Sequence, residues 1–164
     1  MTNRSATAAV QRHRAEPSGR AVVVAELNRR LADSIDLHAQ VKVAHWNVRG
    51  PHFAALHPLF EQFAVALAAR IDQIAERAVT LGGVAEGTLP AVAQRSALAA
   101  YDTSVRDGLG HARQLADRFA AYVGGLQASR RVAEAAGDAD TADLLTQVIG
   151  EFEKFGWFLQ ATVE

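Results

Sequence analysis

Residues 45–83, HWNVRGPHFAALHPLFEQFAVALAARIDQIAERAVTLGG, decide the fold of this chain. They contain two pairs of metal-binding residue types, each at a spacing of four: His57 with Glu61, and Asp72 with Glu76. On a helix of 3.6 residues per turn, residues four apart share a face, and the step of eleven from Glu61 to Asp72 adds a rotation of only about 20°. The stretch after Pro51 is therefore predicted to be one long helix that carries all four polar groups on a single stripe.

The two pairs lie too far apart along such a helix to bind one metal ion together. Eleven residues span about 16 Å of helix axis, whereas metal bonds to imidazole or carboxylate are about 2.0–2.6 Å long. In one interpretation the pairs are unrelated, Glu61 is solvated, and Asp72 and Glu76 meet nearby arginines. In the other, a second copy of the helix runs antiparallel about a twofold axis near Ala66, so that His57 and Glu61 face the partner's Asp72 and the partner's Glu76. The spacing alone leaves both interpretations open.

Composition and charge exclude several classes of function. The chain of 164 residues suits one domain, and it has no cysteine, which excludes a thiol nucleophile, a disulfide framework and zinc-thiolate or iron–sulfur sites. No apolar run is long enough to span a membrane, and the N-terminus lacks the apolar core of a signal peptide, so we expect a cytoplasmic protein. A formal net charge of -1 gives no general attraction to nucleic acid, so any such contact must be local.

The apolar periodicity predicts an all-α fold with four long helices. We expect these helices at residues 22–46, 54–81, 102–135 and 141–162. The longest connection, residues 84–100, falls between the second and third helices and is predicted to carry a short helix at 96–100. Four helices with one long middle connection are typical of a ferritin-like four-helix bundle, in which that connection crosses the bundle.

Residues 1–19 are predicted to be a flexible, mildly basic tail, and residues 20–164 to be the folded domain. A single glutamate, Glu16, opposes the arginines of this first region, which are Arg4, Arg12, Arg14 and Arg20. Either the tail only aids solubility, or it is an arm that contacts DNA phosphates. Its sequence does not decide between the two.

Three segments of the chain closely resemble the Dps family, the mini-ferritins named for DNA protection during starvation. They are LNRRLADSIDLHAQVKVAHWNVRGPHFAALHPLFEQF, DQIAERAVTLGG and DTADLLTQVIGEFEKFGWFLQA, so that the resemblance covers about residues 25–164. The order of HWN, a histidine twelve residues later, a carboxylate four residues beyond it, and then DxxxER is specific.

The resemblance implies a dodecameric hollow shell that oxidises ferrous iron, preferably with hydrogen peroxide, and stores the ferric mineral inside as part of an oxidative-stress response. It implies ferroxidase sites that hold two irons each between twofold-related subunits. His45, His57 and Glu61 would come from one subunit, opposite the partner's Asp72 and the partner's Glu76. The first carboxylate is often aspartate in the family, and Glu61 adds a methylene. Ferrous iron accepts imidazole and carboxylate ligands, and zinc is a strong competitor for them.

Further expectations concern the surroundings of this site. Acidic residues in this region line threefold pores in Dps shells, so the resemblance implies that Asp138, Asp140 and Asp143 guide iron inward; alternatively, they cap the fourth helix and face its positive end. We expect Trp46 to pack in the core and Arg77 to orient a carboxylate at the metal site. An alternative function is a DNA-binding, nucleoid-compacting protein whose metal site is weak or filled by zinc.

Overall fold

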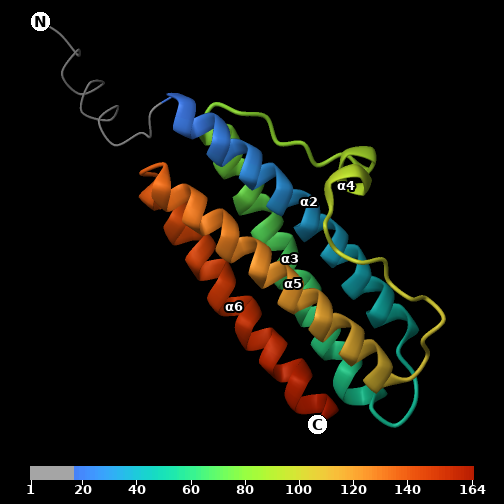
Figure 1. Cartoon of the computed structure of the whole chain (residues 1–164). Helices are drawn as coiled ribbons and strands as arrows, with labels where there is room; N and C mark the ends of the chain where they lie inside the picture. Colours follow the sequence, from blue (N-terminus) through green and yellow to red (C-terminus); the bar gives the residue numbers. More distant parts are fainter. Residues whose placement is uncertain (1–16) are drawn as a thin grey trace, which may run out of the picture.

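The computed structural model describes residues 17–164 and shows a bundle of four long helices (Figure 1). The helices are α2 (Pro17–Asn47), α3 (Phe53–Thr80), the short α4 (Leu89–Arg95), α5 (Gly108–Ala135) and α6 (Ala139–Val163). α2 and α3 form one antiparallel pair and α5 and α6 another, and the segment with α4 crosses the length of the bundle along α2 (Figure 1). The predicted all-α bundle with a crossover between its second and third long helices is confirmed.

Both helix pairs are joined by tight links. Gly50 lies between α2 and α3 with φ 91°, and Gly137 lies between α5 and α6 with φ 71°, values that L side chains rarely adopt. At these two positions glycine lets the backbone turn sharply, so each link is short and its two helices run antiparallel. No helix within residues 17–164 is both long enough and apolar enough to cross a lipid bilayer.

The first helix begins earlier than predicted, at Pro17. Residues 17–19 therefore belong to the helix and not to the tail, and proline is well suited to a first helical position because its missing N–H would have no partner there. The rest of the predicted tail, residues 1–16, lies outside the described residues.

The crossover also differs from the prediction. Its short helix covers Leu89–Arg95 and not residues 96–100, and α5 begins at Gly108 and not at residue 102. Asp107 fixes the start of α5, because its carboxylate accepts a hydrogen bond from the main-chain N–H of Gly110. The backbone of Asp102 is instead held in a turn by the side chain of Gln114, which both accepts from its N–H and donates to its oxygen.

Buried polar side chains of α2 fix the path of the crossover. Asn28 donates to the main-chain oxygen of Val84 at 2.9 Å and accepts from the N–H of Glu86 at 2.8 Å. Asp33, which is 1% exposed, accepts from the N–H of Ala97 at 2.9 Å. Because these groups are buried, each lost hydrogen bond would leave an unpaired polar atom, so the crossover is held firmly.

The centre of the bundle is apolar and aromatic. Its largest fully buried side chains include Phe60, Phe63, Phe119, Tyr122 and Phe152, with ring centroids 5.2 Å apart for both Tyr122–Phe152 and Phe63–Phe119. Within residues 17–164 of one chain, no three His, Asp or Glu side chains are arranged to hold a metal ion.

Candidate metal centre

His45 and His57 stack on each other where α2 turns into α3. Their ring centroids are 3.8 Å apart with the planes inclined by 25°. The Nδ1 atom of each ring lies 2.9 Å from the main-chain oxygen of the other residue. A carbonyl oxygen only accepts hydrogen bonds, so each Nδ1 carries a hydrogen, and Nε2 is the ring nitrogen left for another partner. The backbone thereby prepares both imidazoles to bind a metal ion through Nε2.

Glu61 lies one turn after His57 on α3, and its carboxylate approaches His45. Its Oε2 atom is 3.5 Å from His45 Nε2 and 2.5 Å from Lys42 Nζ. The hydrogen bond from Lys42 lowers the pKa of the Glu61 carboxyl below its usual value, so this group is an anion at neutral pH. The structure thus places His45, His57 and Glu61 close together, and their binding of a metal ion stays a prediction.

Sequence reasoning missed Lys42, which contacts the side chain of Glu61 directly. Lys42 precedes His45 by three residues and therefore shares its helix face, which is the signal that could have identified it. Its side chain is 22% exposed, and its Nζ atom lies 5.8 Å from the centroid of the Trp46 ring.

Trp46 does not pack in the core, so that prediction is wrong. Trp46 is 66% exposed in the single chain, so its side chain faces away from the core. The buried positions nearby are Val41 and Ala44 on α2, and Val48 just after the helix ends. Trp46 follows Ala44 by two residues, a rotation of about 200°, which turns it to the opposite side of the helix.

Asp72 and Glu76 lie exposed on α3, remote from the histidine cluster of the same chain. The arginines expected to meet them are engaged elsewhere: Arg70 contacts Glu151 at 2.7 Å and Arg77 contacts Asp138 at 2.6 Å. Within the described part of the chain, neither Asp72 nor Glu76 forms an ion pair. Two carboxylates therefore remain on the α3 surface without a partner from these residues.

Asp138 caps the start of α6. Its carboxylate accepts from the N–H and the hydroxyl of Thr141 and from Arg77, and the residue is only 4% exposed. Arg77 also donates to the Thr141 hydroxyl at 2.8 Å, so it orients this cap and not a carboxylate of the metal site. Asp140 and Asp143 are exposed on the first turns of α6. Of the three acidic residues, these two have the exposure that a pore lining needs.

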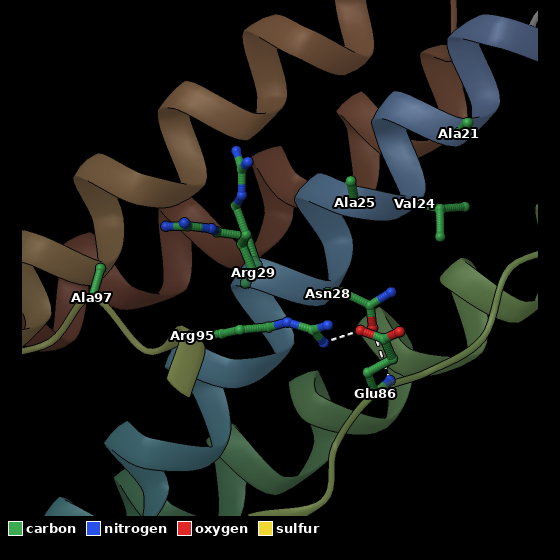
Figure 2. A pocket seen from close by; sticks show the side chains of 9 residues that line it. Ala21, Val24, Ala25, Asn28, Arg29, Glu86, Arg95 and Ala97 are labelled. Atoms are coloured by element: carbon green, nitrogen blue, oxygen red, sulfur yellow. Dashed lines mark hydrogen bonds and ion pairs between the residues drawn. The ribbon is translucent and has the colours of Figure 1, made fainter. Parts of the chain in front are cut away.

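A surface pocket of about 570 Å³ lies between α2 and the crossover (Figure 2). Arginines from both elements line it, but each meets a carboxylate: Arg29 with Glu26, Arg30 with Asp33, and Arg95 with Glu86. The Arg95–Glu86 pair spans the crossover beside the pocket (Figure 2). Because a carboxylate neutralises each of these arginines, the pocket is poorly suited to bind an anion. The histidine cluster is the stronger candidate for a functional site.

The predicted DNA-contacting arginines are mostly beyond the described residues. Arg20 lies in the second turn of α2 and is partly exposed. Arg4, Arg12 and Arg14 lie outside residues 17–164. That these arginines contact DNA stays a prediction.

Comparisons with known proteins agree with this architecture. The ferritin family, described as a ferritin-like domain, matches residues 24–164. The DNA protection during starvation protein of Agrobacterium fabrum is 37% identical over 147 residues, which cover 90% of this chain and 91% of that protein. The crystal structure of a Dps protein from Bacillus brevis superposes with a TM-score of 0.86 at 32% identity, covering 91% of this chain and 99% of the other.

A third relative is described by its chemistry as well as its fold. It is the Dps protein of Vibrio cholerae O1, called a member of a broad superfamily of ferritin-like diiron-carboxylate proteins. Its structure matches with a TM-score of 0.84 at 26% identity, over 90% of this chain and 92% of the other.

Proposed function

This chain belongs to the Dps family of ferritin-like proteins, and we propose that it oxidises ferrous iron with hydrogen peroxide and stores the ferric product inside a dodecameric shell. The observation that carries this proposal is the pair of stacked histidines, each held through Nδ1 by the other's main-chain oxygen. Such a hydrogen bond fixes the tautomer that presents Nε2 to a metal.

The donor set suits ferrous iron as a substrate. Two imidazole nitrogens and the Glu61 carboxylate form a mixed nitrogen and oxygen set, and iron accepts both donor types. Three protein groups are too few to enclose the metal, and within residues 17–164 of one chain no three His, Asp or Glu side chains are arranged to hold a metal ion by themselves. This supports completion of the site by the partner's Asp72 and the partner's Glu76 across a twofold axis, because a twofold interface forms two such sites at once.

The reaction that we propose needs two irons for each peroxide. Each ferrous ion gives up one electron, and hydrogen peroxide takes two electrons and two protons to become two water molecules. A site that holds two irons close together delivers both electrons to one peroxide, so no hydroxyl radical is released. The description of the Vibrio cholerae relative as a diiron-carboxylate protein supports a site for two irons here.

The proposed activity is tested with assembled protein under anaerobic conditions. Ferrous iron is titrated in, hydrogen peroxide is added, and ferric absorbance and hydroxyl-radical trapping are measured against a His57→Ala shell. We expect two irons oxidised per peroxide with little trapped radical. Oxidation no faster than in buffer would contradict the proposal. Tight zinc binding together with that result would favour the alternative of a zinc-occupied, DNA-binding protein.

We expect Asp143→Asn to slow iron uptake about threefold or more at low ferrous concentration, with the shell intact. A ring of carboxylates around a pore would attract cations and raise their local concentration, and the amide removes that charge. Uptake is followed by ferric absorbance, with Asp117→Asn on α5 as the control. Uptake at the rate of the control would mean that Asp143 does not guide iron.

DNA binding is a second function that we propose, because the relatives are named for DNA protection and the first residues of this chain are basic. Each tail is weakly charged, but many tails on one shell would act together. Deleting residues 2–16 should abolish the retardation of duplex DNA in gels while iron oxidation is unchanged. The deletion stops before Pro17 because α2 begins there.

The control for this deletion replaces Arg4, Arg12 and Arg14 by glutamine and keeps the tail length. It should weaken DNA binding to a similar degree, and the binding of the unmodified shell should fall steeply as salt rises. A full-length shell that does not retard DNA even at low salt would limit the function to iron and peroxide.

A further inference from the structure

We propose that Lys42 is a built-in competitor for iron: its ammonium group holds the Glu61 carboxylate in the iron-free protein and must leave before a divalent cation binds there. The inference rests on the proposed function of this site and adds a residue that sets its affinity. It predicts that the protein is tuned to bind ferrous iron more weakly than the ligands alone would allow.

One carboxylate oxygen of Glu61 lies near both the Lys42 ammonium and a ring nitrogen of His45. Glu61 Oε2 lies 2.5 Å from Lys42 Nζ and 3.5 Å from His45 Nε2. A metal ion bound to that oxygen at about 2.1 Å would lie within about 4.6 Å of the ammonium if Lys42 did not move. Repulsion between a dication and a monocation at that distance lowers affinity by about tenfold at moderate ionic strength.

Lys42 has a second position available when it leaves Glu61. Its Nζ atom already lies 5.8 Å from the centroid of the Trp46 ring, and the exposed indole offers an aromatic face to a cation. Its four-carbon stem is flexible, and the side chain is 22% exposed in the single chain, so within one subunit the ammonium can move to solvent or to the ring at little cost. When a metal displaces the Lys42 ammonium from Glu61, the positive charge of Lys42 is therefore not left buried and unpaired.

The choice of residue fits a displaceable cation. The chain contains fifteen arginines but only two lysines, Lys42 and Lys154. An arginine would bind the Glu61 carboxylate through two parallel hydrogen bonds, which would be harder for a metal to break. Lysine binds as a single point charge that yields more readily. Lys42 could instead help the site by positioning Glu61 for the metal, and in that case its removal should weaken metal binding.

The experiment measures cobalt(II) binding to assembled shells by calorimetry, because Co²⁺ takes the same ligand types and is not oxidised by air as rapidly as iron. We expect Lys42→Met to bind about three- to tenfold more tightly than the unmodified protein, with the difference shrinking as salt rises. Lys42→Arg should bind no more tightly than the unmodified protein. Lys154→Met is the matched control, because Lys154 also lies over a ring, 5.5 Å from the centroid of Phe158, but on α6.

A second measurement uses the reaction itself. Lys42→Met should lower the KM for ferrous iron, because the iron-free site loses the ion pair that competes with iron, whereas Lys154→Met should leave this KM unchanged. Equal or weaker cobalt binding by Lys42→Met overturns the role of Lys42 while the metal site stands. An unmodified shell that binds no cobalt overturns the proposed metal site and this inference with it.

Discussion

Replacing Asp72 by asparagine and Glu76 by glutamine together should slow ferrous oxidation by about a hundredfold or more. Both residues are exposed on α3, and within residues 17–164 neither forms an ion pair, so the subunit fold does not depend on their charges. The amides keep the size of the side chains but lose the negative charge that, in the proposed site, would stabilise bound iron and the ferric product. The measurement is the initial rate of ferric absorbance in shells of confirmed size.

The control for this double variant is Asp117→Asn, an exposed carboxylate on α5, which should oxidise iron at the normal rate. Loss of shell assembly in the double variant would be detected by size before rates are compared. An intact double variant with normal activity would mean that the histidine cluster works without the partner's Asp72 and the partner's Glu76.

Replacing Asp138 by alanine should lower the free energy of unfolding by about 2–4 kcal/mol. The change removes the cap of α6, since the carboxylate accepts from Thr141 N–H and Oγ1, and it leaves Arg77 without its 2.6 Å partner. Arg77 is 22% exposed, so water compensates part of the loss. Thermal unfolding of assembled protein gives the measurement.

Asp140→Ala is the matched control for the cap. Asp140 is two residues away, but its side chain is 81% exposed and lies 3.8 Å from Arg77. We expect it to change stability by less than about 0.5 kcal/mol. If both variants lose the same stability, the negative charge near the start of α6 would account for the effect, and the hydrogen bonds of the Asp138 cap would not.

The long helices could be predicted because their apolar positions repeat every three or four residues, whereas the short one could not. Residues 96–100 consist of good helix formers, which made them the expected short helix. In the structure, α2 captures this segment: Asp36 accepts from the Ser96 hydroxyl and Asp33 from the Ala97 N–H. Such contacts join residues about sixty positions apart and leave no trace in local periodicity.

At the candidate metal site, too, the sequence predicted the spacing of residues along a helix but not the contacts between helices. The spacing of His57, Glu61, Asp72 and Glu76 predicted one polar stripe, and it showed that a single metal site using both pairs would need a second helix. It did not predict that His45 and His57 would exchange hydrogen bonds with each other's backbone, because this depends on how closely α2 and α3 approach. Trp46 was misplaced since its size suggested burial, although its helical phase points it outward.

The central claim is that each metal site is shared between two chains, and mixing inactive subunits tests it most directly. Shells of His57→Ala alone and of Asp72→Ala alone should both be inactive. In shells reassembled from equal amounts of the two, half of the twofold pairs are mixed, and each mixed pair keeps one complete site of its two. The account predicts about one quarter of the normal oxidation rate. Mixed shells that contain both subunits and remain inactive would contradict it.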